Sequence, residues 1–142
     1  MAIRCPVTGC MQENPVPVES CQGCGADLRA YAAALKLADL HFNLGLAAAG
    51  EHNYERAKHE LGACLSLRHK DEEAMLVLGK VYWAAGEKRN ARRIWKELLA
   101  TGERDIKRQA EQCIAVTKGK RRRETLAVRG PKSARRRRRT QT

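Results

Sequence analysis

The chain has 142 residues, with 28 Lys and Arg against 16 Asp and Glu, a formal net charge of +12. This length suits one modest domain. No run of 18 apolar residues occurs, and the N-terminus lacks the charged-then-apolar layout of a signal peptide, so we expect neither membrane insertion nor secretion. We therefore place the protein in the cytoplasm, or in the nucleus if the organism has one.

The first 26 residues hold four of the six cysteines as two pairs, Cys5-x4-Cys10 and Cys21-x2-Cys24. Glycines stand beside the sulfurs, where tight turns need them. Four thiolates at this spacing suit one structural Zn²⁺, and such a closed site leaves no open position for catalysis. Two disulfides are the alternative, but a chain without an export signal belongs to a reducing compartment, which favours the metal.

Residues 1–26 resemble a small zinc ribbon, and Asn14 between the two pairs matches the cysteine and asparagine spacing of the Ran-binding-protein type zinc finger. That family often binds single-stranded RNA or ubiquitin, which the resemblance implies here as one alternative. However, Ile3 stands at the position of the family's leading tryptophan, and no aromatic residue precedes Tyr31. Base stacking is therefore not expected. The simpler interpretation is a folded cap on the helices that follow.

A helical domain is predicted over residues 27–117. Asp27 can cap the start of a helix whose alanine-rich stretch, 30–34, has high helix propensity and which leads directly into the next element. Residues 38–71 and 72–105 then read as two copies of one 34-residue unit, because Leu44-Gly45 and Ala57 recur in step as Leu78-Gly79 and Ala91.

This register resembles the tetratricopeptide repeat, although the family's tryptophan position holds His41 and Met75. The resemblance implies a helix-turn-helix in each copy, stacked copies that share a core, and a concave groove that holds another protein. Apolar residues at spacings of three and four predict the core. They are Phe42, Leu44, Leu61, Cys64, Leu65, Leu78, Tyr82, Ile94, Trp95 and Leu98.

Two repeats are fewer than the roughly three that such arrays need, so a further helix over residues 105–117 is expected to cap them. Its apolar face carries Ile106, Ala110, Cys113 and Ile114. The fold class is thus all-α: a short tetratricopeptide-repeat helical stack with a capping helix, a small N-terminal zinc ribbon and a disordered basic tail over residues 118–142.

The resemblance also implies which side chains line the partner-binding groove. They are Asp39, Phe42, Asn43, Leu46, Glu73, Leu76, Lys80 and Trp83. This set is apolar with a few acids, which favours an amphipathic helix or a hydrophobic peptide as the ligand. Trp83 is expected to anchor that ligand, unless it packs under the last helix instead.

The tail holds nearly all of the net charge. Residues 1–117 carry 16 basic against 15 acidic side chains, whereas residues 118–142 carry 12 against Glu124 alone. Such charge suits RNA or DNA phosphates without base reading, although nuclear import, an anionic membrane or an acidic protein would use the same charge. The predicted nucleic-acid-binding residues are Lys118, Lys120, Arg121, Arg122, Arg123, Arg135, Arg136, Arg137, Arg138 and Arg139.

The sequence thus predicts a non-enzymatic adaptor that binds a protein through its groove and RNA or DNA through its tail. The alternative is a structural subunit of a larger complex, whose groove and tail both contact protein neighbours. Cys64 and Cys113 fall on apolar faces, so packing explains them better than redox chemistry does.

Overall fold

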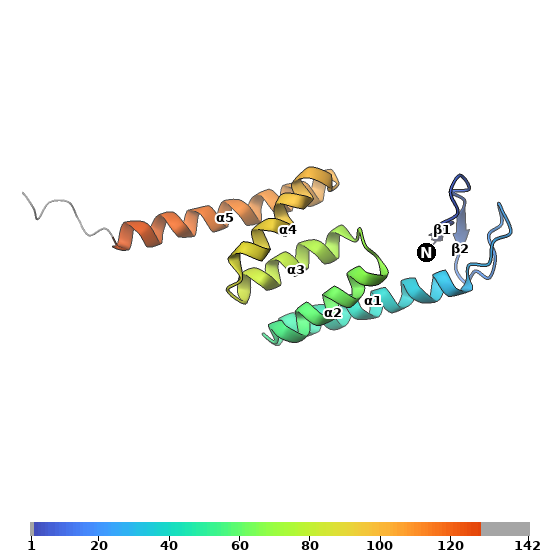
Figure 1. Cartoon of the computed structure of the whole chain (residues 1–142), viewed down its shortest axis with the longest axis horizontal. Coiled ribbons are helices and arrows are strands. Elements are labelled where there is room, and N and C mark those ends of the chain that lie inside the picture. Colours follow the sequence, from blue (N-terminus) through green and yellow to red (C-terminus); the bar gives the residue numbers. More distant parts are fainter. Residues whose placement is uncertain (1, 129–142) are drawn as a thin grey trace, which may run out of the picture.

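The computed structural model describes residues 2–128, and their side chains up to residue 119. Two short strands precede five helices in this part of the chain (Figure 1). They are β1 (Ala2–Arg4), β2 (Glu13–Pro15), α1 (Arg29–Gly50), α2 (Tyr54–Leu67), α3 (Glu72–Ala84), α4 (Lys88–Thr101) and α5 (Arg104–Val128). The all-α prediction is confirmed. Within the described residues, no helix has the length and apolar character to cross a membrane.

α1 is one continuous helix that leads from the cysteine-containing segment into the helical stack, here defined as α1–α5. It begins one residue later than the predicted cap implies, because Leu28 and not Asp27 occupies the N-cap position. The Asp27 carboxylate still accepts the backbone N–H of Arg29 at 2.9 Å. The next two helices begin at side-chain caps: Asn53 accepts the N–H of Arg56, and Asp71 that of Ala74.

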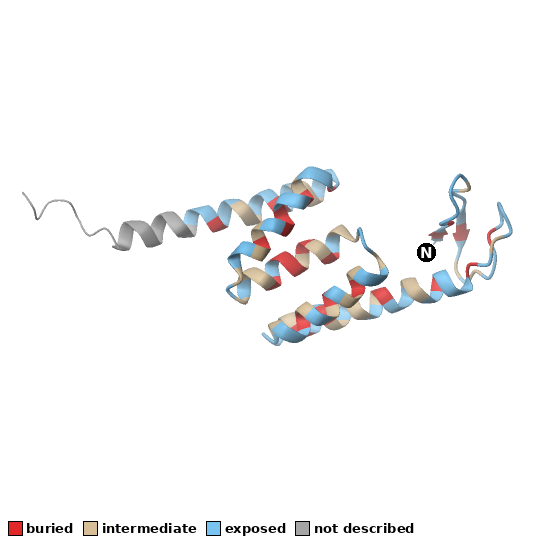
Figure 2. Ribbon diagram, in the orientation of Figure 1, coloured by how far each residue is buried: buried red, intermediate tan, exposed pale blue. Residues whose placement is uncertain are grey.

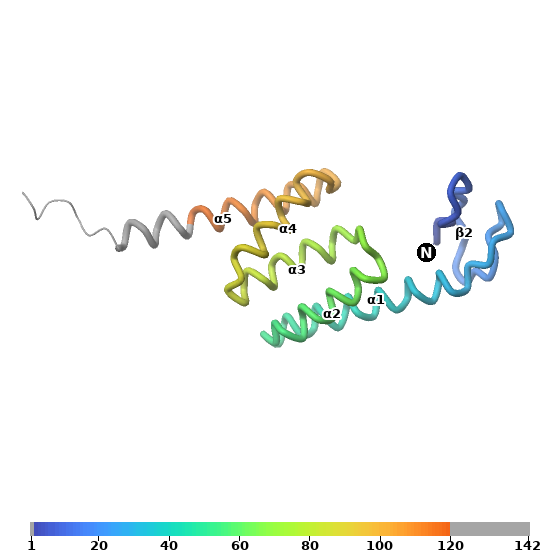
Figure 3. The backbone as a smooth tube through the Cα atoms, viewed as in Figure 1, coloured from blue at the N-terminus to red at the C-terminus, as the bar shows by residue number. Residues whose placement is uncertain are grey.

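The helices pair as two hairpins, α1 with α2 and α3 with α4, and the trace of Figure 3 shows them in succession. Each hairpin closes on a glycine. A Cβ on Gly45 would lie 2.7 Å from Leu61 Cγ, and a Cβ on Gly79 would overlap the Trp95 indole. The two backbones in each pair therefore approach closely only because these glycines have no side chain.

The core runs through the middle of the stack, where buried residues line the facing sides of the helices (Figure 2). Leu61, Cys64, Trp95 and Leu98 are among the predicted core residues that it buries. Three small residues are equally enclosed at the helix contacts. They are Ala38, Ala48 and Ala74.

The N-terminal module, residues 2–28, has a core of its own. Cys5, Cys21 and Leu28 pack together there, apart from the core of the stack. The module lies at the free end of α1, beyond the turns that α2 covers (Figure 1). The expectation that it caps the stack is therefore wrong. Its buried apolar side chains pack within the module, and the first turns of α1 extend beyond the stack toward it.

At the other end, α5 packs against α4 and α3 and buries Ala110, as expected for the capping helix. Its predicted end at residue 117 is wrong, because α5 continues to Val128. The physical reason is propensity: Lys and Arg are good helix formers, and no proline follows until Pro131. The predicted disordered tail thus begins too early.

Candidate metal centre and partner-binding pocket

The four predicted metal ligands come together in the N-terminal module. The β1–β2 hairpin carries Cys5 and Cys10, and the following loop carries Cys21 and Cys24. All four Sγ atoms lie within 4.8 Å of one another, with Cys5 and Cys24 at 3.7 Å and Cys10 and Cys21 at 3.6 Å. All four cysteines are free thiols. Such a cluster can hold a metal ion.

Backbone turns aim these sulfurs at one point. The N–H of Cys5 donates to the Gln12 carbonyl at 2.8 Å, and the N–H of Cys21 donates to the Ala26 carbonyl at 2.8 Å. Gly25 follows the second pair with φ 74, a left-handed conformation that side chains disfavour. The glycine next to the last cysteine is therefore a requirement of the turn.

Asn14 connects the two halves of the module. Its side chain is fully buried; Nδ2 donates to the Gln12 carbonyl at 3.0 Å and to the Cys21 Sγ at 3.6 Å. Its Oδ1 accepts the backbone N–H of Gln22 at 2.8 Å. Partners of this kind orient metal ligands from outside the coordination sphere, so Asn14 fits a positioning role at the cluster.

Hydrogen bonds and burial set the ionisation of the cluster. Backbone N–H groups, first that of Cys24 and then that of Gly23, bond the Cys21 sulfur and lower its pKa to about 6. At Cys5 the backbone N–H of Val7 acts in the same direction, but burial and the three neighbouring thiols together raise the pKa to about 12. A bound cation would stabilise the deprotonated form of the coordinating thiols.

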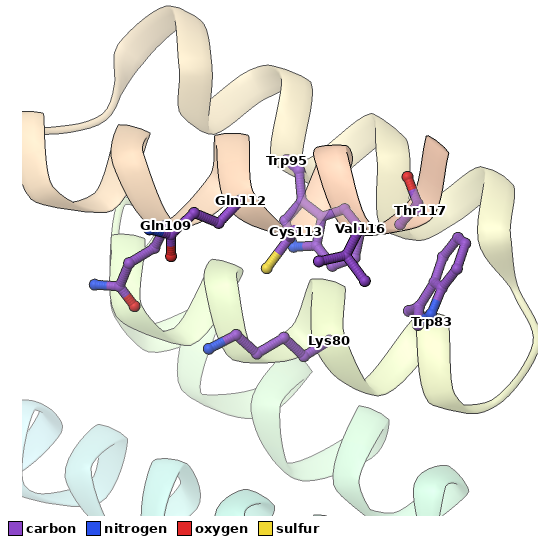
Figure 4. A pocket seen from close by; sticks show the side chains of 8 residues that line it. All are labelled: Lys80, Trp83, Trp95, Gln109, Gln112, Cys113, Val116 and Thr117. Atoms are coloured by element: carbon purple, nitrogen blue, oxygen red, sulfur yellow. The ribbon is translucent and has the colours of Figure 1, made fainter. Parts of the chain in front are cut away.

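A second candidate site lies between α3 and α5. It is a pocket of about 260 Å³ (Figure 4). Lys80 and Trp83 of α3 line one side, Cys113 and Val116 of α5 line the other, and Trp95 of α4 lies between them. Gln109, Gln112 and Thr117 complete the lining. The pocket combines apolar walls with amide, ammonium and thiol groups at its edge.

Only two of the predicted groove residues line the α3–α5 pocket. Lys80 and Trp83 share the α3–α5 pocket, whereas Asn43 and Leu46 are exposed on α1 and Glu73 is exposed near the start of α3. Asp39 and Phe42, also on α1, are drawn into other contacts. Asp39 accepts a hydrogen bond from the Arg68 guanidinium at 2.6 Å, and Phe42 packs against the core.

The prediction that Leu76 lines the partner-binding groove is wrong, because its side chain is only 4% exposed and cannot contact a partner. α3 is the central helix of the stack and touches α1, α2, α4 and α5. These neighbouring helices cover the Leu76 side chain, which therefore belongs to the core.

Trp83 is neither fully exposed nor fully buried. Its ring lies 6.1 Å from that of Trp95, in contact with the core. Two cations of α4 cover part of it, with Lys88 Nζ 5.5 Å and Arg92 Cζ 5.8 Å from the ring centroid. The Trp83 indole therefore does two things at once: it packs against the core beneath the last helices, and it lines the pocket.

Sequence reasoning missed the basic side chains of α4. Five of them line one surface: Lys88, Arg89, Arg92, Arg93 and Lys96. The signal was present as pairs of cations four residues apart, with Glu97 as the single acid of the helix. It was hidden because residues 1–117 have nearly balanced charge as a whole.

The predicted tail residues fall largely outside the described part of the chain. Lys118 is exposed on α5. The side chains of Lys120, Arg121, Arg122 and Arg123 lie beyond it, as does the whole of residues 129–142, including Arg135, Arg136, Arg137, Arg138 and Arg139.

The two remaining thiols belong to packing contacts. Cys64 is fully buried between helices, and Cys113 is half-buried at the pocket. Burial raises the pKa of both thiols, which favours their protonated form at neutral pH. Protonated thiols are poor nucleophiles, so neither environment resembles that of a reactive cysteine.

No protein-family model, curated protein or solved structure matches this chain.

Proposed function

We propose that the protein is a non-enzymatic adaptor. Its helices form two tetratricopeptide repeats, the α3–α5 pocket binds a protein ligand, and the basic C-terminal segment binds RNA or DNA. The observation that carries this proposal is the pocket itself, in which Trp83 and Val116 offer apolar surface beside the Lys80 ammonium. Apolar surface with a few polar groups at its edge is what recognition of a peptide side chain requires.

The repeat assignment is supported by the two glycine contacts. Gly45 with Leu61 and Gly79 with Trp95 are equivalent pairs 34 residues apart, and each lets the second helix of a hairpin lie on the first. Ala57 and Ala91, which recur at the same interval, are both fully buried. Coincident register in sequence and packing is typical of a repeat.

We further propose that the cysteine cluster binds one structural Zn²⁺. Tetrahedral zinc with Zn–S bonds of about 2.3 Å places its sulfurs about 3.8 Å apart. The Cys5–Cys24 and Cys10–Cys21 separations of 3.7 and 3.6 Å agree with that spacing. Bound zinc would supply no reaction here, because four protein ligands close the coordination sphere. Its role is to hold together a module whose own core is very small.

The chemistry around the pocket suggests the ligand: an amphipathic helix or hydrophobic peptide with acidic residues beside its apolar anchor. The anchor would fill the space between Trp83 and Val116, and its acidic neighbours would meet Lys80 and the cations above Trp83. Charge at the edge of an apolar contact fixes the orientation of a ligand more than it adds affinity.

Val116 offers a direct test of the pocket, because it is 67% exposed and its replacement should leave the fold intact. We expect Val116→Glu to lose the partner in affinity capture from the protein's own cells, after nuclease treatment and mass spectrometry. Ala115→Glu is the matched control, since it adds the same charge at the exposed neighbouring residue, outside the pocket lining. Equal capture by both variants and the wild type would count against the pocket.

The nucleic-acid role is supported by composition. Residues 118–142 carry 12 basic side chains and one acidic one, and phosphate neutralisation by such a segment releases counterions without any fixed fold. Deleting residues 129–142 removes the Arg135–Arg139 run while sparing α5, which ends at Val128. We expect this deletion to weaken binding of RNA and DNA strongly and to leave the helical signal unchanged. Undiminished binding would refute the tail assignment.

A structural subunit is the second candidate, favoured by the exposed leucines of α1. Leu37, Leu40 and Leu46 are 45%, 53% and 41% exposed on this helix. If protein neighbours bind this surface, the double variant Leu37→Ser with Leu40→Ser should fail to capture them, whereas Val116→Glu should still do so. The two candidates therefore give opposite patterns in the same capture experiment.

A further inference from the structure

α4 separates its side chains into an apolar side and a cationic side. Ala91, Ile94, Trp95 and Leu98 are buried against the rest of the stack. On its other side are the five cations named above, Lys88, Arg89, Arg92, Arg93 and Lys96, here called the α4 basic face. All are exposed except Arg92, which is half-buried. They line a shallow depression of about 500 Å³, to which no other residue of the described part of the chain contributes.

These cations have no acidic partners within the described part of the chain. The ion pairs found there are formed by cations on other elements: Lys58 binds Glu55 and Glu87, and Arg68 binds Asp39 and Asp71. The first turns of α5 differ too, since Arg104, Lys107 and Arg108 share their depression with Glu111. The α4 basic face is thus a surface of uniform sign on a body whose total charge is almost balanced.

Part of this face is held in position before any ligand arrives. The Lys88 ammonium and the Arg92 guanidinium lie over the Trp83 ring at 5.5 and 5.8 Å, a cation–π geometry. Trp83 is itself packed on Trp95. Ordering of long side chains is one of the main costs of binding an anion, so this contact lowers that cost.

We infer that the α4 basic face is a phosphate-binding surface that holds the backbone of an RNA or DNA strand. This inference rests on the proposed nucleic-acid role and adds a folded surface to the tail. The eight-residue interval from Lys88 to Lys96 spans about 12 Å of helix, at about 1.5 Å a residue. Along the axis of a duplex, one strand advances about 3.4 Å per nucleotide, so the face covers the axial length of three or four nucleotides. Contacts to phosphates carry no sequence information, so we expect this surface to bind without sequence preference.

The test is a salt titration of the full-length protein with labelled RNA and DNA single strands of the same mixed sequence. Arg89→Gln with Arg93→Gln removes two exposed charges that make no contact with Trp83. Each lost phosphate contact lowers the slope of log affinity against log salt by about 0.7 on single strands, so we expect a fall of about 1.4. The control, Lys36→Gln with Lys70→Gln, removes the same charge from exposed positions elsewhere and should keep the wild-type slope.

Arg89→Lys with Arg93→Lys keeps the charge and should keep the slope, which separates lost phosphate contacts from altered folding. A double glutamine variant with the slope and affinity of the control overturns the inference. The deletion of residues 129–142 tests the proposed tail role independently. If only that deletion weakens binding, the tail role stands and the α4 surface is refuted. If only the Arg89→Gln with Arg93→Gln variant weakens binding, the α4 surface stands and the tail role is refuted. Binding of neither RNA nor DNA at low salt refutes both.

Discussion

Gly79 lies directly against the Trp95 indole, so closely that a Cβ on the glycine would overlap the ring. The indole is 2% exposed, and within the described structure its Nε1 has no hydrogen-bond acceptor. This contact joins α3 to α4 in the core. Trp83 packs against the same Trp95 ring, and both tryptophans line the pocket. The close approach of helix backbone to a large ring therefore supports both the fold and the candidate binding site.

Gly79→Ala should destabilise the protein by about 1–3 kcal/mol, because the new methyl group forces the indole or the helix to move. The gain in helix propensity, at most about 1 kcal/mol, is too small to offset this. Gly62→Ala in α2 is the control, since no atom lies within 4 Å of a Cβ built there and the substitution should stabilise the helix. Urea unfolding of the two variants measures the contrast. Equal effects of the same sign would contradict the close contact.

The two tryptophans should differ in what they contribute. Trp95→Ala deletes a side chain that is 2% exposed and should cost about 3–5 kcal/mol of unfolding free energy. Trp83→Ala removes a half-buried ring, so the loss of stability should be clearly smaller while partner capture is lost. Thermal and urea unfolding, run beside the capture assay, measure both quantities. Equal destabilisation would show that Trp83 acts mainly in packing.

The metal centre predicts one zinc per chain in protein prepared without chelator. Cys21→Ser should abolish this content and loosen the N-terminal module, whereas the helical signal of α1–α5 should persist because the module has a separate core. Elemental analysis and circular dichroism measure the two effects. Protein that is fully folded and free of zinc would exclude a structural metal.

Asn14→Ala should lower metal affinity by about 10- to 100-fold, as loss of a partner outside the coordination sphere commonly does. The change leaves the N–H of Gln22 without its acceptor and removes a donor to the Cys21 sulfur. Gln22→Ala is the matched control, because only the backbone of Gln22 takes part in this network. Chelator competition monitors the metal. Equal affinity in the two variants would remove Asn14 from the positioning role.

The ion pair between the two hairpins predicts a dependence of stability on pH. Lys58 of α2 donates to Glu87, which precedes α4, at 2.7 Å, and this bond, followed by that from Asn90, lowers the pKa of Glu87. Because the pKa of Glu87 is lower in the folded than in the unfolded protein, ionised Glu87 stabilises the fold. This stabilisation is complete above the unfolded pKa, about 4.3, and is lost as pH falls through the folded pKa. Glu87→Gln should therefore melt below the wild type at neutral pH, with a gap that closes in acid.

Glu55→Gln is the control for this pair. Glu55 also contacts Lys58, but its side chain is 86% exposed, against 36% for Glu87, and it lies on the same helix as the lysine. Its replacement should change the melting temperature little at any pH, since exposed pairs within a helix contribute little. Thermal melts between about pH 3 and 7 compare the variants. A gap for Glu87→Gln that stays constant over this range would contradict the linkage.

Much of the molecule was predictable because it depends on local order in the chain. Helix periodicity, the 34-residue recurrence of Gly45 and Gly79, and the spacing of four cysteines are all properties of short segments. The same holds for the caps at Asn53 and Asp71, which act within three residues of their own position. The sequence alone therefore determined the all-α class, the order of the helices and the four sulfurs of the candidate metal centre.

The tertiary structure decided what depends on how helices cross. Leu76 is covered because α3 packs among α1, α2, α4 and α5, and Lys58 meets Glu87 across 29 residues of sequence. The N-terminal module lies apart from the core of the stack because its buried apolar side chains pack against one another. The cations of α4 gather on one side of the helix without acidic partners in the described part of the chain, whereas Glu87 and Asp39 pair with Lys58 and Arg68. Packing and charge pairing act between segments distant in sequence, and the order of residues along the chain does not contain those distances.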